Sequence, residues 1–383
     1  DKDGKPMGAQ RIELSSVISD IAAGPFGSNL KVSCFVDDGF PIIDGANLKV
    51  YKVTDNVTKF VTEEKAQSLH RAIAHRGDVV VTISGTLGQI AYIPEDSAYD
   101  AYLVSQRQFR VTFDTEKVCV PYLVFYFHTY EGQNKILSFA NQVGVPALSQ
   151  PLKNFRQIKV ELPDLSVQRQ IASVIQIFND KIELNERINH NLEQQARAIY
   201  NSMFIANADP TWTNGHLSDL VVVRYGKDHK KLADGPYPVY GSGGIMRYVE
   251  KPLYTHESVL IPRKGTLNNV MYVCEPFWSV DTMFYTEMLR PNISKFVFHF
   301  VSSKDLASMN AGSAVPSMTT DILNAMELTI PSETALEAFE QVVAPMFTAI
   351  QANKMQSDEL AAIRDTLLPK LMTGELDVSE VQL

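Results

Sequence analysis

The sequence predicts an α+β protein in which two similar domains are separated by two long antiparallel helices that form a coiled coil. The first observation is a repeat: GTLGQIAYIPE from Gly85 recurs as GTLNNVMYVCE from Gly265, with five of eleven positions identical. The second is that each half of the chain ends in a long segment whose apolar residues follow heptad spacing. The repeat is far longer than a solenoid unit of roughly 20 to 50 residues, which indicates a duplicated domain.

The order of the segments predicts four parts. VPAL from Val145 is answered by VPSM from Val315, and LP at Leu162 is answered by IP at Ile330. Each LP or IP pair opens a long helical pattern. We therefore expect a first globular domain, a first spacer helix, a second globular domain, and a second spacer helix with the C-terminal tail, at residues 1–161, 162–209, 210–331 and 332–383.

The composition is ordinary for a globular protein, with 45% hydrophobic and 21% charged residues. No apolar run approaches the roughly 18 residues that a membrane-spanning helix needs, so we expect no membrane partner. The three cysteines, Cys34, Cys119 and Cys274, are far apart and odd in number, which argues against a disulfide framework and a zinc site. The expected compartment is therefore the reducing cytoplasm.

The formal net charge of −9 argues at first against a nucleic-acid partner, but the charge is unevenly distributed. The globular parts are almost neutral, with 17 basic and 18 acidic residues in 1–161 and 11 of each in 210–331. The helical parts carry more acid, with 4 basic and 6 acidic residues in 162–209 and 3 and 9 in 332–383. Neutral domains with local basic patches are compatible with binding a polyanion.

The first long helix is expected to begin with Ser166 as its N-cap, shortly after Pro163. Its apolar seam follows a 4-3 spacing: Ile171, Ile175, Phe178, Ile182, Leu192, Ala196, Ile199 and Met203. The second long helix is expected after Pro331, with Thr334 and Glu337 forming a capping box. Pro345 should kink the second helix or delay its regular start, because proline lacks a backbone N–H.

Both helical seams are interrupted by polar residues at the same place. Asn185 and Asn189 occupy the skipped positions of the first helix, and Asn353 and Ser357 follow them at an offset of 168 residues. In an antiparallel pair the middle of one helix meets the middle of the other, so these polar residues should face each other. Heptad spacing with a shared polar layer favours a coiled coil, with two ordinary core helices as the alternative.

Each globular part mixes short β-rich runs with Gly and Pro turn signals, which predicts an α+β domain with a curved sheet. The candidate strands are GDVVVTI from Gly77, QIAYI from Gln89, QFRVTF from Gln108, QIKVEL from Gln157, SVLIP from Ser258, NVMYV from Asn269 and MELTI from Met326. The aromatic-rich segments YLVFYF from Tyr122 and KFVFHFV from Lys295 are expected to form buried helices.

The sequence contains no catalytic constellation that we can identify. It lacks a P-loop, a nucleophile elbow, a zinc-protease motif and the signatures of amino-methyltransferases. The glycine-rich YGSGG from Tyr240 lacks the strand and helix context of a dinucleotide site, and His70 and His75 match no metal-binding pattern. We therefore expect a non-catalytic chain without a metal or cofactor of its own.

The remaining candidates are loops of a binding type. In the first half they are Ser28, Asn29 and Lys31 of GPFGSNLK, Asn47 of NLKVYK, and Gln106 and Arg107 of SQRQFR. In the second half they are Arg224, Lys227, Lys230 and Lys231 of RYGKDHKK, Ser242 of YGSGG, the following Arg247, and Arg263 and Lys264 of PRKG. Arg, Lys, Asn and Gln are the residues that base edges and phosphates require, so two such sets favour DNA. The alternatives are a non-DNA adaptor or scaffold with two duplicated binding domains, and an enzyme with an unrecognised site.

Longer motifs recur in a fixed order along essentially the whole chain. LPDLSVQRQIASVI begins the first long helix and LLPKLMTGEL ends the second. The turn motif GPFGSNLK and the VPAL segment precede the first of these, whereas the turn motif PVYGSGGI, the IPRKGTL loop with the following PFWSVDTMFY, and the VPSM segment lie between the two. In this order the motifs resemble the specificity subunit of a type I restriction-modification enzyme.

The resemblance implies two target-recognition domains, each reading one half of a split double-stranded DNA sequence in the major groove. The paired helices would act as a spacer and as a docking surface for two methyltransferase subunits, which would bring S-adenosylmethionine and adenine methylation. Restriction subunits, with motor and nuclease activity and with ATP and Mg²⁺, would join for cleavage. The chain itself would carry no cofactor and would perform none of this chemistry.

Overall fold

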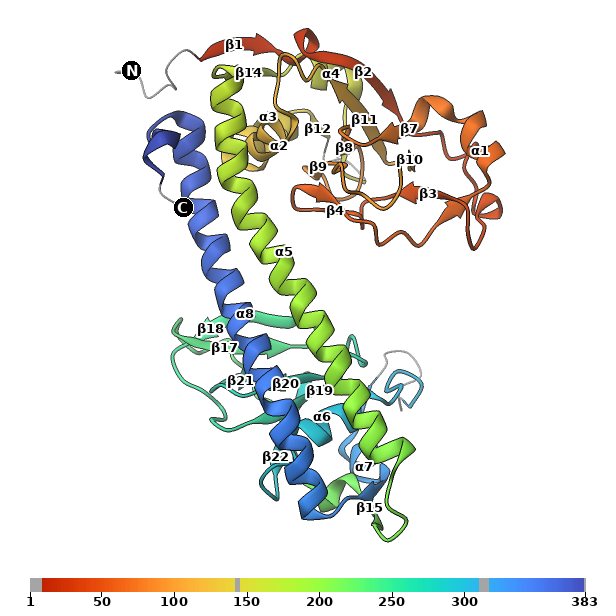
Figure 1. Cartoon of the computed structure of the whole chain (residues 1–383), viewed down its shortest axis with the longest axis vertical. Helices are drawn as coiled ribbons and strands as arrows, with labels where there is room; N and C mark the ends of the chain where they lie inside the picture. Colours follow the sequence, from red (N-terminus) through yellow and green to blue (C-terminus); the bar gives the residue numbers. More distant parts are fainter. Residues whose placement is uncertain (1–8, 142–144, 310–316, 382–383) are drawn as a thin grey trace. The chain divides into compact units, whose positions relative to one another are not determined.

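A computed structural model describes residues 9–141, 145–309 and 317–381 (Figure 1). The chain forms two compact units. The first comprises the residues up to Glu183 together with those from Ser357 onward, and the second comprises Leu184–Gln356. Each long helix therefore contributes one part to each unit. The four-part division expected from the sequence stays a prediction.

The first unit contains two main sheets. The larger has six strands in the order β2 (Ile18–Ala23), β11 (Gln108–Phe113), β8 (Val79–Thr82), β9 (Ile90–Tyr92), β5 (Lys52–Val53) and β4 (Leu48–Lys49). The smaller has four, in the order β6 (Phe60–Val61), β3 (Phe40–Ile43), β10 (Ala101–Val104) and β7 (Ile73–His75). Two-stranded pairs join β1 (Gln10–Glu13) to β14 (Lys159–Leu162) and β12 (Ala140–Asn141) to β13 (Ala147–Leu148).

Strand β8 explains why the run GDVVVTI is almost continuously apolar. Val79 and Val81 face one core cluster, which includes Phe109, while Val80 faces a second cluster, which includes Tyr102. Because successive strand residues point to opposite faces, a strand covered on both sides must be apolar at every position. Strand β8 is therefore buried on both faces, between the two core clusters of the first unit.

The helices of the first unit are α1 (Glu63–Ser68), α2 (Val120–His128), α3 (Tyr130–Leu137) and α4 (Pro151–Arg156). Helix α2 is the aromatic segment that was expected to be buried, and Phe125 and Phe127 are almost fully covered in the core. The N-cap of α3 is Thr129, whose hydroxyl accepts a hydrogen bond from the Gly132 N–H. Helix α2 packs against β9, so the aromatic residues fill one face of the larger sheet.

The second unit has a simpler set of sheets. Four strands follow the order β16 (Val221–Tyr225), β22 (Met283–Met288), β19 (Ser258–Pro262) and β20 (Met271–Val273). Three more follow the order β18 (Gly244–Val249), β17 (Tyr237–Gly241) and β21 (Trp278–Ser279), and β15 (Thr213–His216) pairs with β23 (Glu327–Ile330). Helix α6 (Ser294–Ser302) is the second expected aromatic helix and is buried, and α7 (Thr320–Asn324) precedes β23. All seven candidate strands are therefore confirmed, several of them shorter than the apolar run.

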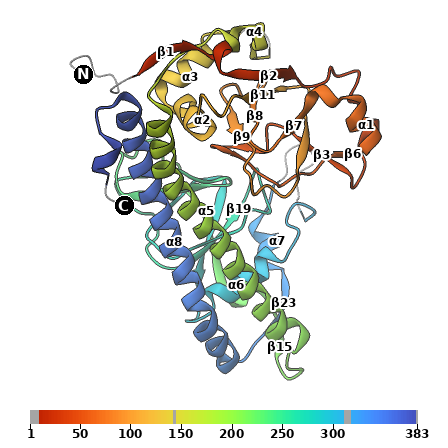
Figure 2. The ribbon, with the colours of Figure 1, turned by 45° about the horizontal axis from the view of Figure 1, so that its top comes forward.

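The long helices α5 (Leu165–Asn201) and α8 (Glu333–Thr373) pack side by side in both units (Figures 1 and 2). In the first unit the start of α5 shares a core with the end of α8, through Ile171, Ile175, Phe178, Leu368 and Leu371. In the second unit the end of α5 shares a core with the start of α8, through Ala196, Tyr200, Leu336, Phe339 and Val343. The expected antiparallel pairing of the two helices is confirmed. Each fully buried Leu, Ile, Val or Phe contributes about 1.5–3 kcal/mol to this packing.

The predicted ends of the helices need correction. Helix α5 begins at Leu165, so Ser166 lies inside the helix and is not its N-cap. Helix α8 begins at Glu333, and the Ser332 hydroxyl caps it by accepting a hydrogen bond from the Ala335 N–H at 3.3 Å. The capping box of Thr334 and Glu337 is therefore wrong, because a serine one residue after Pro331 already serves the first turn.

Pro345 does not delay the start of α8, because that helix runs without interruption from Glu333 to Thr373. The expectation of a delayed start was therefore wrong. Proline in a helix removes one backbone hydrogen bond and crowds the preceding turn. On the N-terminal side of this residue, Phe339 and Val343 pack into the buried core of the second unit.

The polar layer of the helix pair lies in the second unit. The Asn353 Nδ2 donates to the Asn189 Oδ1 at 2.8 Å, which confirms that these residues face each other. The Asn185 Nδ2 donates to the Gln356 Oε1 at 2.9 Å, so Gln356 joins the layer although the heptad pattern did not include it. Asn185 and Asn189 are buried, and buried amides need such partners because an unmade hydrogen bond is costly.

Candidate nucleic-acid interface

The repeated Gly-Thr-Leu segment forms the same loop in both units. Gly85 has a φ of 98° and Gly265 a φ of 86°, a region that residues with a Cβ rarely adopt. In the first unit the Ile83 N–H donates to the Arg107 carbonyl at 2.6 Å. In the second the Arg263 N–H donates to the Thr282 carbonyl at 2.9 Å. The glycine recurs because the loop backbone requires it.

The segment before each long helix pairs with this loop. The Leu148 N–H donates to the Ile83 carbonyl at 2.8 Å, and the Met318 N–H donates to the Arg263 carbonyl at 2.9 Å. Val315 and its following proline lie outside the described residues, so the comparison of VPAL with VPSM rests on the last two residues of each. The two halves therefore share a loop scaffold as well as a sequence motif.

A second pair of glycines brings another loop against the scaffold. The Gly24 N–H donates to the Gln108 carbonyl at 2.8 Å, and the Gly226 N–H donates to the Met283 carbonyl at 3.0 Å. A Cβ on Gly24 would lie 1.9 Å from a backbone carbonyl oxygen, and a Cβ on Gly226 would lie 2.0 Å from one. No side chain fits at either position. GPFGSNLK and RYGKDHKK are thus equivalent loops, and each approaches the start of an equivalent strand, β11 in the first unit and β22 in the second.

The first unit has a cavity of about 520 Å³ beside its Gly-Thr-Leu loop, with both polar and apolar side chains in its lining. Thr86, Gln106 and Arg107 are exposed side chains of its lining. Below them the Thr82 hydroxyl donates to the Gln89 Oε1 at 3.0 Å, and the Gln89 Nε2 donates to the Gly45 carbonyl at 3.0 Å. A network of this kind fixes the floor of the cavity while the exposed side chains stay available to a ligand.

Most of the first-half candidates lie on this side of the unit. Ser28, Asn29 and Lys31 are exposed on the GPFGSNLK loop. A Cβ on Gly27 of that loop would lie 2.6 Å from the Gln106 Oε1, which places the loop against SQRQFR. These predicted residues are separated by about eighty positions in the chain but belong to neighbouring loops.

Asn47 was expected to bind DNA, and the structure corrects this prediction. It is only 4% exposed, and its Nδ2 donates to the Thr54 carbonyl at 3.2 Å and to the Asn56 carbonyl at 3.1 Å. Its Oδ1 accepts a hydrogen bond from the Asp44 N–H at 3.0 Å. The amide is thus used to hold the turn between β3 and β5, and it is not presented to a ligand.

In the second unit three of the candidates lie around Gly265. A Cβ on Gly265 would lie 2.6 Å from the Ser242 Oγ, so the YGSGG turn touches the repeated loop. The Arg263 guanidinium lies over the Tyr225 ring at 5.4 Å from its centroid. Lys264 is exposed beside it. The structure thereby brings Ser242 to Arg263 and Lys264, which follow it by more than twenty residues in the sequence.

The other second-half candidates differ in how free they are. Lys227 is exposed, and its backbone is fixed because the Trp278 Nε1 donates to its carbonyl at 2.8 Å. Lys230 and Lys231 are also exposed. Arg224 pairs with Glu287 at 3.1 Å. The Arg247 Nη2 donates to Asp234 at 2.8 Å and to the Leu232 carbonyl at 2.9 Å. These hydrogen bonds within the unit already engage the Arg247 guanidinium.

Sequence reasoning missed several residues of these surfaces. Thr86 and Lys59 line the first-unit cavity, and Tyr225 supports Arg263 in the second unit. Thr86 carried a signal, because it belongs to the repeated Gly-Thr-Leu segment. Lys59 and Tyr225 carried none, because their positions depend on strand pairing that is distant in sequence.

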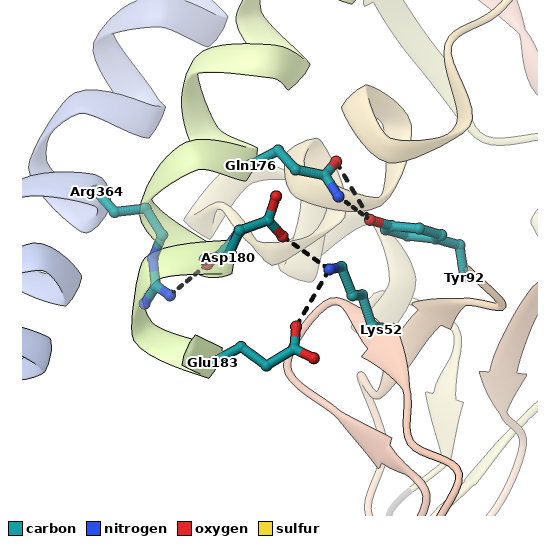
Figure 3. Close-up of polar contacts among 7 residues, drawn as sticks. Lys52, Tyr92, Gln176, Asp180, Glu183 and Arg364 are labelled. Carbon is teal, nitrogen blue, oxygen red and sulfur yellow. Dashed lines mark hydrogen bonds and ion pairs between the residues drawn. The ribbon is translucent and has the colours of Figure 1, made fainter. Parts of the chain in front are cut away.

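Polar contacts attach the globular part of the first unit to its long helices (Figure 3). Lys52 contacts Asp180 at 2.9 Å and Glu183 at 3.3 Å. Burial lowers the pKa of Lys52, but the hydrogen bond that Lys52 donates to Asp180 and the nearby negative charges outweigh burial, so the net shift of the pKa is upward. The Tyr92 hydroxyl accepts a hydrogen bond from the Gln176 Nε2 at 3.1 Å, and the Arg364 guanidinium lies 5.2 Å from the Tyr51 ring centroid.

In the second unit a buried lysine joins the globular part to the long helices. The Lys295 side chain is 4% exposed and contacts Glu340 of α8 at 2.6 Å. It also lies 5.1 Å from the ring centroid of Tyr272, which is the repeat counterpart of Tyr92. Both tyrosines of the repeated segment therefore help to join a globular part to the helices.

The described residues contain no group of three or more His, Cys, Asp or Glu side chains placed to hold a metal ion. No helix in the described part of the chain is long and apolar enough to cross a bilayer. The three cysteines are free thiols. What the geometry offers is two sets of exposed donors on matched loops.

Comparison with known proteins identifies the family. A family model described as the type I restriction modification DNA specificity domain matches residues 33–194 and 210–357. The MjaIX type I restriction enzyme specificity subunit of Methanocaldococcus jannaschii is 21% identical over 364 residues, covering 84% of this chain and 82% of that protein. The HindI type I restriction enzyme specificity subunit of Haemophilus influenzae is 26% identical over 133 residues, covering 35% of this chain and 25% of that protein.

A solved structure shows the same fold. The S subunit of a type I restriction-modification system from M. genitalium superposes with a TM-score of 0.59 at 15% identity, covering 95% of this chain and 96% of that one. The family model matches twice, once on each half of the duplicated sequence. The chain therefore belongs to the type I restriction-modification DNA specificity family.

Proposed function

We propose that this chain is the sequence-specific DNA-binding specificity subunit of a type I restriction-modification complex. Each unit reads one half of a bipartite double-stranded DNA target with the loops around its Gly-Thr-Leu segment. The observation that carries this is one loop scaffold bearing two different sets of exposed or partly exposed side chains. The first set includes Gln106 and Arg107, and the second includes Arg263 and Lys264. A shared scaffold with different donors supports the reading of two different half-sites.

The paired helices dock two methyltransferase subunits. Exposed apolar residues support this: Ile177 is 49%, Leu184 41% and Ile188 37% exposed along α5. At spacings of seven and four residues they share one face of the helix. Met355 and Ile363 of α8 are also exposed, at 57% and 47%. Apolar side chains on a charged helix surface favour a protein partner.

Catalysis belongs to the partner subunits. The methyltransferase subunits bring S-adenosylmethionine and the adenine methylation chemistry, and restriction subunits bring ATP, Mg²⁺ and cleavage. This chain carries no cofactor and works in the cytoplasm, where its three free thiols stay reduced.

Methylation mapping tests the proposed function. The chain is co-expressed with its methyltransferase partner, and methylated adenines are sequenced in cells with and without the gene. A bipartite methylated motif that disappears without this chain is the expected result. A partner complex that assembles but neither binds nor methylates DNA would instead support a non-DNA adaptor.

The helices set the gap between the half-sites in this proposal. One heptad inserted after Asn189, with a second before Asn353, keeps the seam in phase because these residues face each other. Seven residues add about 10 Å of helix, and DNA rises about 3.4 Å per base pair. The gap between the half-sites should grow by up to about three base pairs while both half-site sequences stay the same. An unchanged gap in an active complex would mean that the helices are not the spacer.

A further inference from the structure

The structural repeat extends to a loop in which sequence similarity is weak. In the first unit the Gln108 N–H donates to the Ser105 carbonyl at 3.1 Å. In the second the Met283 N–H donates to the Val280 carbonyl at 2.9 Å. Gln108 and Met283 also accept the equivalent hydrogen bonds from the two crowded glycines. Ser105–Gln108 and Val280–Met283 are therefore the same loop in the two units.

This equivalence pairs the two central residues of each loop. Arg107 corresponds to Thr282, because each carbonyl accepts the hydrogen bond from the residue two before the repeated glycine. Gln106 then corresponds to Asp281. The first unit presents an amide and a guanidinium at this place, whereas the second presents a carboxylate and a hydroxyl.

Asp281 lies within the cluster of second-half candidates. Its backbone carbonyl accepts a hydrogen bond from the Arg263 Nη1 at 3.2 Å, and Arg263 precedes Lys264 and Gly265. The Asp281 side chain is exposed. Within the described part of the chain its carboxylate forms no ion pair, although the Arg263 guanidinium is close by.

A carboxylate at this position needs a physical reason. Phosphates repel it, so on a surface that binds DNA it lowers affinity for every sequence unless it meets a hydrogen-bond donor. On the edges of bases in the major groove, the donors are the exocyclic amino groups of cytosine and adenine. A carboxylate accepts such a bond, and Asp or Glu paired with the cytosine N4 is a recognised contact of this kind.

We propose that Asp281 determines specificity in the second half-site by accepting a hydrogen bond from the exocyclic amino group of a base. This inference rests on the proposed function and adds a residue that the sequence pattern did not select. The neighbouring Arg263 and Lys264 offset the negative charge against the DNA backbone. Thr282 stands where Arg107 stands in the first unit, so the two half-sites are read by different chemistry at equivalent positions.

The experiment uses the full chain assembled with its methyltransferase partner. Binding is measured on duplexes carrying every single base substitution in both half-sites, for wild type, Asp281→Asn and Asp281→Ala. Glu327→Gln serves as the matched control, because it removes an exposed carboxylate on β23 of the same unit. Correct assembly is verified by co-purification of each variant with its methyltransferase partner in the same ratio as wild type.

Asp281→Ala should lose discrimination at one base pair of the second half-site, by roughly 5- to 160-fold, the range that one good base contact supplies. Discrimination in the first half-site should stay the same. Asp281→Asn should shift preference at that base pair toward adenine, because an amide both donates to and accepts from the adenine edge. Glu327→Gln should leave all preferences unchanged.

Two outcomes would overturn the proposal. One is a uniform gain in affinity on all duplexes, which would mean that Asp281 only repels phosphates. The other is an unchanged preference at every position of the second half-site. A failure of the proposed function would look different, because the wild-type complex would then show no sequence preference in either half-site.

Discussion

Replacing Arg107 by alanine tests base reading in the first unit. The guanidinium is exposed at the cavity, and its Nη1 lies 3.9 Å from where a Cβ on Gly85 would stand. The loop scaffold uses the Arg107 backbone: its carbonyl accepts a hydrogen bond from the Ile83 N–H at 2.6 Å, and its N–H donates to the Ser105 Oγ at 3.4 Å. Truncation of the side chain should therefore change the free energy of unfolding by no more than about 0.5 kcal/mol, as is usual for exposed sites.

The expected functional effect is much larger. A bidentate contact between arginine and guanine discriminates by about 1–3 kcal/mol, which is roughly 5- to 160-fold in relative affinity. Discrimination at one base pair of the first half-site should fall by this factor in Arg107→Ala. Arg107→Lys is the matched control, because it keeps the charge but loses the planar fork that makes two parallel hydrogen bonds. It should lose the same discrimination while keeping most of its affinity for unrelated DNA.

Competition binding of the assembled complex measures both effects, with every single substitution in each half-site and at several salt concentrations. A phosphate contact gives another pattern: affinity falls alike on all sequences, and the salt slope drops by about 0.9. That pattern in Arg107→Ala would refute the base-reading assignment. So would a loss of discrimination in the second half-site.

Gly24→Ala should destabilise the first unit more than Gly85→Ala, because it places a Cβ 1.9 Å from a backbone oxygen. Gly85→Ala adds only the backbone strain of a positive φ, about 1–2 kcal/mol. Equal shifts of the denaturation midpoint for the two variants would contradict this prediction. Asn189→Ala should cost about 1–3 kcal/mol by removing the 2.8 Å partner of Asn353. The double variant with leucine at positions 189 and 353 should recover most of the lost stability in calorimetry. A double variant as unstable as Asn189→Ala would contradict this prediction. Burial, with a smaller effect of a nearby arginine, lowers the pKa of His299 from 6.5 to about 4. The unfolded chain then takes up a proton first, so stability is full above pH 6.5 and falls as the pH drops toward about 4. His299→Leu should flatten that part of the stability profile, and an unchanged profile would assign it to other groups.

The sequence by itself determined the duplication, the two long helices and the positions of the strands. These features have local or periodic signals. The heptad seam marked α5 and α8, and alternating or continuous apolar runs marked strands such as β11 and β19. Gly85 and Gly265 recur because a positive φ is a property of one residue in one loop. A heptad pattern in two helices also indicates which residues face each other, which is why Asn189 and Asn353 were expected to meet.

Only the tertiary structure decided which side chains are presented to a ligand. Asn47 looked like a loop donor, but its side-chain amide donates its hydrogen bonds to backbone carbonyls of the surrounding turn. Arg247 looked free, but a loop near the start of its hairpin supplies Asp234 and a carbonyl. Asp281 had no signal, because its equivalence to Gln106 exists only in backbone hydrogen bonds between distant strands. Exposure and hydrogen-bond partners depend on contacts between segments far apart in the chain, and no local pattern of residues records those contacts.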